Sequence, residues 1–446
     1  MTDRKAKVDE VLSKAKEKKV KFIRFWFTDV LGFLKSFSIT ETEFENGLLG
    51  GMGFDGSSIE GYARIEESDL IALPDLDTFT ILPFGGTEEH KIGMVYCDIK
   101  NPDGSPYEGC PRYALKRMIQ KANDMGFSHF YTGPELEFFL FKDSKCPQVL
   151  DEGGYFDMTT RDAAYDLRRD CALGLESMGI EVEFTHHEVA PSQHEIDMRY
   201  KEALKMADQV MSCRILVKEI AMSRGQFATF MPKPLFGENG SGMHVHQSLF
   251  KGEKNAFFDS NDKYSLSETA KQFTAGLLKH SKEIVSIIAQ WVNSYKRLVP
   301  GYEAPVYISW ARRNRSALIR VPMYKPGQEK ATRVEMRCPD PACNPYLAFA
   351  VMLGSGLKGI EEKYELRGPV EEDIFEMTPE EREKHGIESL PGALNEAVNF
   401  TKSSEIVREI LGDHIFEKFI ENKEIEWDRY RMHVSQFEID EYMPLL

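Results

Sequence analysis

The sequence predicts an α+β protein of two domains, a small strand-rich domain followed by a larger one in which strands alternate with helices. Aromatic and β-branched segments follow one another as far as Ile99, which favours strands. Residues 101–106, Asn-Pro-Asp-Gly-Ser-Pro, interrupt both helix and sheet and form the clearest linker. From Asn344 onward the apolar pattern is mainly helical. We therefore place the domains at residues 1–105 and 106–446.

The first domain is expected to begin with a helix and a β-hairpin. Apolar residues recur at helical spacing between Val8 and Ala15, and the lysines around them fall on the outer face. Residues 20–27 and 33–39 are aromatic and β-branched, and the residues between them supply a turn. More strand-like segments complete a domain of about a hundred residues.

The second domain is expected to alternate helices and strands. Apolar faces within residues 114–122 and 164–178 predict two helices, which end at Gly126 and Gly179. Strand-like segments then lie at residues 180–189, 193–200, 226–232, 243–250, 306–310, 316–321 and 332–338.

Composition excludes several classes of function. The chain has 446 residues, of which 42% are hydrophobic and 29% charged, as in ordinary globular domains. Its formal net charge of −16 opposes nonspecific attachment to nucleic acid or to an anionic membrane surface. A polyanionic substrate must therefore be held by a local group of positive charges.

The cysteines and the N-terminus predict a cytoplasmic protein. The seven cysteines are scattered and form no C-x-x-C pair, so we expect reduced thiols and neither a disulfide framework nor a zinc knuckle. The first residues run into a charged amphipathic segment without the apolar core of a signal peptide. No apolar stretch approaches the roughly eighteen residues of a membrane span.

Acidic residues and a histidine stand at strand spacing in the larger domain. Side chains at i and i+2 of a strand point to one face, so Glu135 lies beside Glu137 and His244 beside His246. Further carboxylates of this set are Glu188, Glu195 and Glu335. Oxygen-rich donor sets suit Mg²⁺ or Mn²⁺, and we expect two such ions. The alternative for any single pair is the solvated face of an edge strand.

Positive charge is concentrated in one part of the larger domain. Seven arginines carry it, namely Arg297, Arg312, Arg313, Arg315, Arg320, Arg333 and Arg337. Guanidinium groups match phosphate and carboxylate oxygens, and together with paired cations they point to phosphoryl transfer. The alternating strand positions are favoured for ligand contact over Arg312 and Arg313, and the remaining arginines would form surface ion pairs.

Three loops are ambiguous from local chemistry. Asn239-Gly240-Ser241-Gly242 permits close approach of a ligand to the backbone but is also an ordinary hairpin turn. Asp55 in Phe54-Asp55-Gly56-Ser57-Ser58 is typical of an Asx-turn. Residues 299–305 are equally compatible with a mobile flap and a simple connection.

Taken together, these motifs resemble those of the type I glutamine synthetases of bacteria and archaea, in order and across nearly the whole chain. The length fits the shorter subgroup of that type. The motifs are residues 54–58, Gly133-Pro134-Glu135-Leu136-Glu137, residues 239–244, residues 299–305, Asn314-Arg315-Ser316 and Arg333-Val334-Glu335-Met336-Arg337.

The resemblance implies a β-grasp domain followed by a catalytic domain with a curved antiparallel sheet flanked by helices, in a dodecamer of two hexameric rings. It implies that one Mg²⁺ or Mn²⁺ near glutamate is bound by Glu137, Glu188 and Glu195. It implies that a second ion, which bridges the ATP phosphates, is bound by Glu135, His244 and Glu335.

The implied reaction joins ammonia to L-glutamate through γ-glutamyl phosphate at the expense of ATP. Arg315, Arg320 and Arg337 would offset the developing charge of the phosphoryl group. Asp55 of the adjacent subunit would bind ammonium and take its proton, and Glu303 on the flap would exclude water. The implied substrate contacts are Ser58, Glu137, Gly240, His244, Arg297 and Arg320.

The resemblance also implies contacts to ATP and a mode of regulation. The implied nucleotide contacts are Tyr200, His246, Ser248, Lys330 and Arg333. Phe375 stands where adenylylated members carry a modifiable tyrosine, which excludes adenylylation at that position. Arg64 resembles the arginine linked to glutamine feedback in the shorter subgroup. Activation by 2-oxoglutarate and binding of a nitrogen-signalling protein stay open.

Two other functions on the implied fold are alternatives to ammonia ligation. A relative of the same fold joins glutamate to a polyamine or another amine, but Asp55 beside Ser58, together with Glu303, favours ammonium. A noncatalytic regulatory member of an assembly should have lost metal ligands, and this sequence retains all six.

Overall fold

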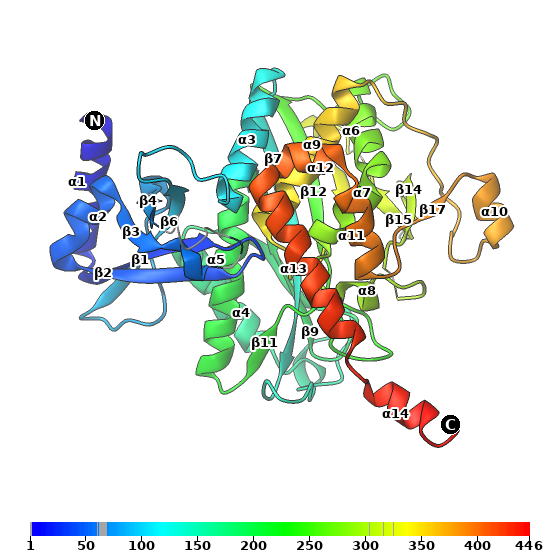
Figure 1. The fold of residues 1–446 in the computed structure, drawn as a ribbon, viewed down its shortest axis with the longest axis horizontal. Coiled ribbons are helices and arrows are strands. Elements are labelled where there is room, and N and C mark those ends of the chain that lie inside the picture. Colours follow the sequence, from blue (N-terminus) through cyan, green and yellow to red (C-terminus); the bar gives the residue numbers. More distant parts are fainter. Residues whose placement is uncertain (1, 60, 62–68, 303, 315, 324) are drawn as a thin grey trace.

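The computed structural model describes residues 2–59, 61, 69–302, 304–314, 316–323 and 325–446. Its elements form two sheets, a small one near the N-terminus and a large one covered by helices (Figure 1). Arg64, Glu303 and Arg315, which the sequence analysis singled out, lie outside the described residues.

The N-terminal sheet has the strand order β2-β1-β6-β4-β3, with β5 paired to β6. The predicted hairpin is confirmed, since β1 and β2 pair antiparallel and set Phe25 opposite Phe37. The next pair, β1 and β6, is parallel. Helices α1 and α2 pack against this sheet. The elements are α1 Thr2–Glu17, β1 Val20–Thr28, β2 Leu34–Thr40, α2 Phe44–Gly50, β3 Met52–Asp55, β4 Asp69–Pro74, β5 Thr80–Ile81 and β6 Lys91–Lys100.

The large sheet has the order β17-β14-β15-β16-β12-β7-β9-β8, with β10 and β11 also paired to β7 and β13 to β12. Its strands are β7 His129–Phe141, β8 Val182–His187, β9 Gln193–Met198, β10 Lys201–Glu202, β11 Phe227–Thr229, β12 Met243–Lys251, β13 Lys254–Asn255, β14 Tyr307–Ala311, β15 Ala317–Arg320, β16 Val334–Met336 and β17 Glu388–Ser389.

One pair in this sheet differs from the antiparallel arrangement expected. Strands β14 and β15 are parallel, whereas the other described pairs are antiparallel, so the sheet is mixed. Residues 239–242 do not form a hairpin turn, because β11 and β12 each pair with β7 and not with one another.

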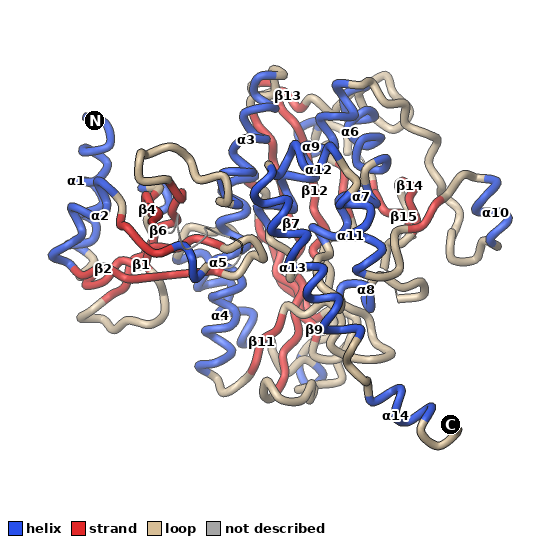
Figure 2. Tube along the Cα trace, in the orientation of Figure 1, coloured by secondary structure: helices blue, strands red, loops and turns tan. Residues whose placement is uncertain are grey.

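Helices cover the sheet with α9 at their centre (Figure 2). Helix α9 is apolar on nearly all sides and packs against α3, α5, α6, α7 and α12. Its start is fixed by Asn344, whose side chain accepts the Tyr346 N–H at 3.1 Å. The helices are α3 Pro111–Asp124, α4 Tyr165–Ser177, α5 Ala203–Ser223, α6 Glu268–Lys279, α7 Ser281–Ile288, α8 Ser294–Arg297, α9 Pro345–Glu361, α10 Pro379–Lys384, α11 Leu394–Lys402, α12 Glu405–Leu411, α13 Asp413–Arg431 and α14 Gln436–Tyr442.

A buried arginine joins the two sheets. Arg112 on α3 donates to Asp75 at 2.7 Å and to Asp98 at 2.6 Å, both in the N-terminal region. It also donates to both carboxylate oxygens of Asp208 on α5, at 3.0 and 3.1 Å. Tyr346 on α9 donates to the same carboxylate at 2.6 Å. The region of the N-terminal sheet is thereby fixed to the helices that cover the large sheet.

Among the described residues, no helix combines the length and the apolarity needed to cross a lipid bilayer.

Candidate active site

Strand register brings the predicted metal ligands together on one face of the large sheet. Glu135 on β7 lies opposite His244 on β12, and Glu137 lies opposite Glu195 on β9. Glu335 on β16 lies between its cross-strand partners His246 and Arg320. On β7 the alternate side chains, including Leu136 and Phe138, are buried in the core on the other face.

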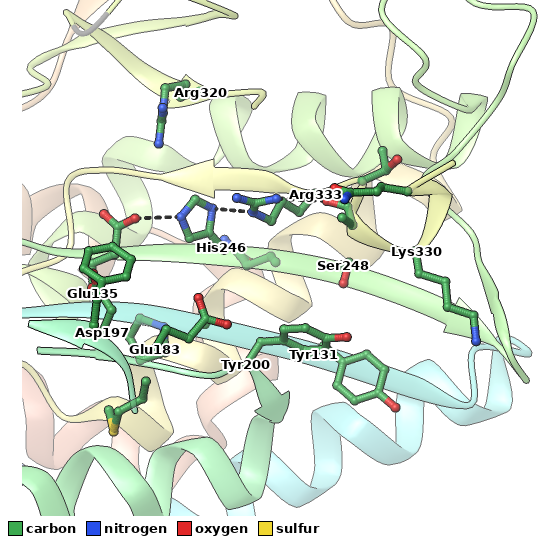
Figure 3. Close-up of a pocket in the computed structure, with 18 residues that line it drawn as sticks. Tyr131, Glu135, Glu183, Asp197, Tyr200, His246, Ser248, Arg320, Lys330 and Arg333 are labelled. Carbon is green, nitrogen blue, oxygen red and sulfur yellow. Dashed lines mark hydrogen bonds and ion pairs between the residues drawn. The ribbon is translucent and has the colours of Figure 1, made fainter. Parts of the chain in front are cut away.

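The first cluster of donors surrounds Glu135. His246 Nε2 lies 2.8 Å from one of its carboxylate oxygens (Figure 3), and His244 Nδ1 lies 3.0 Å from the other. His244 Nδ1 is also 3.8 Å from Glu335 Oε1. Burial raises the pKa of Glu135, but hydrogen bonds from both histidines outweigh it and hold that pKa well below its usual range.

His246 acts as a bridge in this cluster, while His244 is the histidine of the predicted ligand set. Arg333 Nε donates to His246 Nδ1 at 3.1 Å, so His246 carries its proton on Nε2 and donates it to Glu135. The geometry also places His246 Nε2 with Glu135 and Glu335 in a compact group of possible ligand atoms, all within 4.8 Å of one another. In this arrangement, however, Nε2 of His246 carries a proton and Nδ1 accepts from Arg333, so His246 has no lone pair left for a cation.

The second cluster contains Glu137, Glu188 and Glu195, as predicted, together with His186. His186 lies 3.6 Å from Glu188 Oε1 and 3.5 Å from Glu195 Oε1. Its Nδ1 faces the carbonyl of His187 at 3.1 Å, which leaves Nε2 as the free acceptor. His186 was missed: its position two residues before Glu188 is readable from the sequence, but its place opposite Glu195 depends on strand pairing.

The second cluster is short of positive charge. Burial and the charge of Glu188 raise the pKa of Glu137 well above its usual range. Burial and the neighbouring Asp197 raise the pKa of Glu195 in the same way. Asp197 itself has a pKa raised to about 7, chiefly by burial. A divalent cation fits this donor set because it would relieve the repulsion.

A cavity of about 470 Å³ opens beside the first cluster (Figure 3). The predicted nucleotide residues all line it, namely Tyr200, His246, Ser248, Lys330 and Arg333. Tyr131, which the sequence analysis missed, meets Tyr200 edge-on with ring centroids 5.5 Å apart. Two aromatic rings at one end and a guanidinium at the other suit a base and its phosphates.

A second cavity of about 450 Å³ opens beside the second cluster. Arg297, Arg320 and Arg337 line it, as does Gly240. A Cβ atom at Gly240 would lie 2.4 Å from the Pro232 carbonyl oxygen, so no side chain fits there. The buried Arg297 guanidinium donates to the backbone carbonyls of residues 337, 338 and 339 at 2.9–3.2 Å, which fixes its orientation.

Aromatic residues missed by the sequence analysis cover His186 in this second cavity. The rings of Tyr155 and Phe156 stack with centroids 4.1 Å apart, and each meets His186 edge-on. Phe184 stacks on the same imidazole at 5.7 Å. Phe156 holds a φ of 62°, a conformation that is uncommon outside glycine and typical of functional sites.

Some predicted residues lie away from both cavities. Asp55 ends β3 and accepts hydrogen bonds from Ser57 N and Oγ at 2.8 and 2.7 Å, which confirms the Asx-turn. Neither Asp55 nor Ser58 lines either cavity within one chain. The backbone N–H groups of Arg312 and Arg313 donate to Glu371, and these arginines line a separate cavity.

The fold and the site together define a class of ATP- and cation-dependent ligases. Residues 19–102 match the family described as glutamine synthetase, β-grasp domain, and residues 108–442 match glutamine synthetase, catalytic domain. The chain belongs to the glutamine synthetase family, and it is a glutamate–ammonia ligase of glutamine biosynthesis and nitrogen metabolism.

Individual relatives match along almost the whole chain. It is 51% identical to the glutamine synthetase of Thermotoga maritima over 433 residues, which are 96% of this chain and 98% of the relative. It is 50% identical to that of Mycobacterium tuberculosis over 440 residues, with 98% of both chains covered. A solved structure of a GmaS/ADP complex superposes with a TM-score of 0.88 at 29% identity, and covers 97% of this chain and 99% of its own.

Proposed function

We propose that this chain makes L-glutamine from L-glutamate, ammonia and ATP through γ-glutamyl phosphate, with two Mg²⁺ or Mn²⁺ ions in each site. The observation that carries the proposal is the convergence of the six predicted metal donors, from β7, β9, β12, β16 and the β8–β9 turn, beside the two cavities. Members of the family use ATP and divalent cations. The oxygen-rich clusters are suited to Mg²⁺ and to Mn²⁺.

The metal ligands are proposed residue by residue. Glu137, Glu188 and Glu195 would bind the ion nearer glutamate. Glu135, His244 and Glu335 would bind the ion nearer the nucleotide, and His244 would then give up the proton on Nδ1 that now faces Glu135. When bound, the cations neutralise the phosphate oxygens during transfer.

The protein's own groups would orient the two substrates. Three backbone carbonyls fix the orientation of Arg297 beside Gly240. Glutamate would therefore be positioned against a guanidinium group that does not move. Arg337 and Arg320 both face Glu335, at 3.3 Å for Arg337 Nε, and would offset charge on the transferring phosphoryl group. We assign the same role to Arg315 on the strength of the family motif alone.

Adenine would stack near Tyr200 and Tyr131, with Ser248 and Lys330 beside it and Arg333 toward the phosphates (Figure 3). The exposed Lys330 pairs with Glu253 at 2.7 Å, and ATP would compete for it.

The ammonium site would be completed by a neighbouring subunit. Asp55 and Ser58 lie in the β-grasp region and line neither cavity of their own chain, which supports a contribution across an interface. Glu303 would close the site as a flap residue. We assign the chain to the shorter type I subgroup and expect the dodecamer of two hexameric rings, in which residues 1–105 and 106–446 form the two domains.

The assignment to the shorter type I subgroup also suggests how the enzyme is regulated and where it is located. Phe375 has no hydroxyl group, so adenylylation at that position is excluded, and Arg64 would mediate feedback by glutamine. Effects of 2-oxoglutarate or of a nitrogen-signalling protein are compatible with this proposal. The free cysteines, six of them buried, suit the reducing cytoplasm.

The decisive assay follows phosphate release with glutamate and ATP, adding either ammonium or putrescine. The proposal predicts release that depends on ammonium, with L-glutamine as the product. Preference for putrescine would make the chain a γ-glutamyl-amine ligase on the same fold. Absence of ATP cleavage with either amine would favour a noncatalytic member of an assembly.

A further inference from the structure

A buried chain of charged and polar side chains lies behind the second metal cluster, on the opposite face of β8 and β9. We call it the back network, and it consists of Asp151, Asp162, Arg168, His187 and His194. His187 and His194 are cross-strand partners, directly after the His186–Glu195 pair that faces the cavity. Strand alternation therefore places the network immediately beneath the proposed ligands.

One half of the network fixes β9. Arg168 on α4 forms a bidentate pair with Asp162 at 2.9 and 2.5 Å, and its Nη1 donates to His194 Nδ1 at 2.9 Å. A guanidinium can only donate, so His194 is neutral and carries its proton on Nε2. Burial and the charge of Arg168 lower the pKa of His194 to about 3, in agreement with that assignment.

The other half fixes β8. His187 Nε2 lies 3.0 Å from Asp151 Oδ1, and its Nδ1 lies 2.7 Å from the carbonyl oxygen of Glu188. Both partners are acceptors, so this imidazole carries two protons and a positive charge. Asp151 also accepts the N–H groups of Ser192 at 2.9 Å and Ala163 at 2.8 Å, which ties the loop before α4 to the β8–β9 turn.

The two halves meet at the histidine rings, whose centroids are 4.8 Å apart at 81°. His194 Nε2 has no hydrogen-bond partner in the described part of the chain. The three residues Asp151, His187 and His194 could be mistaken for a metal site, since their ligand atoms lie within 4.8 Å. The proton on His194 Nε2 argues against this, because a metal needs the lone pair.

We propose that the back network positions Glu188 and Glu195 for the cation nearer glutamate, an inference that rests on the proposed function. Glu188 is held through its own backbone carbonyl, and Glu195 through the neighbouring residue of β9. Groups behind a metal site orient its ligands, and their loss typically weakens binding about 10- to 100-fold. Among the described residues, none of the hydrogen bonds named above for the network reaches Glu135, His244 or Glu335, so we expect the effect to be confined to one ion.

The test measures Mn²⁺ binding to the full-length protein by electron paramagnetic resonance in two backgrounds. Glu335→Gln removes a ligand of the nucleotide-side ion and isolates the site of Glu188 and Glu195. Glu188→Gln isolates the other site. Asp151→Asn or His194→Leu is then added to each background. We expect the dissociation constant to rise about 10-fold or more in the first background and to change less than about twofold in the second.

Two further variants separate positioning from general damage. His194→Asn keeps an acceptor for Arg168 and should restore affinity to within about threefold of its parent. Leu175→Ala leaves a cavity on the same face of α4 without touching the network, and should lower stability with no selective loss of Mn²⁺. Equal weakening of both sites, unchanged affinity in Asp151→Asn and His194→Leu, or the same selective loss in Leu175→Ala would overturn the inference. If neither parent binds Mn²⁺, the proposed metal sites themselves are wrong.

Discussion

At the scale of the residue, the site is built from side chains whose charge depends on what they face. Glu135 receives two imidazole hydrogen bonds that hold its pKa low, whereas burial and other carboxylates raise the pKa of Glu137, two residues along β7, and of Glu195, opposite it on β9. The two proposed cation sites therefore differ before any ion binds. We expect the site of Glu137 and Glu195 to gain more from a cation, because burial and neighbouring carboxylates raise both pKa values and Arg297 offsets only part of this effect at Glu137.

Metal binding should depend on pH in a direction set by these carboxylates. Their raised pKa values mean that protons compete with a cation for these carboxylates. Affinity for Mn²⁺ at the Glu137 and Glu195 site is therefore expected to rise with pH and to fall as the carboxyls are protonated. Isothermal titration calorimetry in buffers of different ionisation enthalpy should show net proton release, and proton-neutral binding would contradict this account.

Gly240 tests the steric part of the substrate site. A Cβ atom there would meet the Pro232 carbonyl oxygen at 2.4 Å and the Arg297 side chain at 3.0 Å. Gly240→Ala is therefore expected to displace Arg297 and to raise the KM for glutamate about 10-fold or more, with a smaller change in the KM for ATP. The control is Gly50→Ala, where nothing lies within 4 Å. An unchanged KM for glutamate would remove Gly240 from the site.

At the scale of the element, the sequence predicts strands well where one face is buried and the other carries ionisable side chains of the site. The alternation around Glu135 and Glu137 predicts β7, and the aromatic hairpin of β1 and β2 is confirmed. It does not predict the order of the strands, because β7 pairs with β9 and β12 across more than fifty residues of chain. His186 and Asp197 were missed for that reason, since their roles depend on neighbours from other strands.

The parallel pairing of β14 and β15 was not predicted for the same reason. Pattern alone indicates that two segments are strands and carries no information on their relative direction. The roles of Asp55 and Glu303 are likewise beyond local chemistry. Asp55 is an ordinary Asx-turn in its own chain, and only the family motif gives it a catalytic assignment.

Helix α3 supplies a prediction about stability. Arg112→Met would leave Asp75, Asp98 and the buried Asp208 without their common partner. Breaking a buried ion pair on one side typically costs about 3–5 kcal/mol, so urea unfolding should begin at clearly lower concentration. Lys116→Met also removes a partner of Asp98, but this lysine is one-third exposed and its loss should cost less than about 1 kcal/mol. Equal effects of the two variants would contradict the role of Arg112.

At the scale of the whole molecule, the C-terminal helix stands clear of the body (Figure 1). Helix α14 and the residues after it expose large apolar side chains, among them Phe437, Met443 and Leu446. Exposed apolar groups of this size mark contact surfaces. We expect removal of residues 436–446 to reduce the proposed dodecamer to smaller species in size-exclusion chromatography with light scattering, while the circular dichroism spectrum of each subunit is retained. A truncated protein with the mass of the intact assembly would contradict this.

The large sheet is the scaffold on which the whole account depends, because it brings donors from β7, β9, β12, β16 and the β8–β9 turn to one place. The most direct measurement is anomalous diffraction at the manganese edge from crystals grown with Mn²⁺ and ADP. The account predicts two peaks in each chain, one among Glu137, Glu188 and Glu195 and one among Glu135, His244 and Glu335. A single peak, or manganese bound away from these carboxylates, would contradict it.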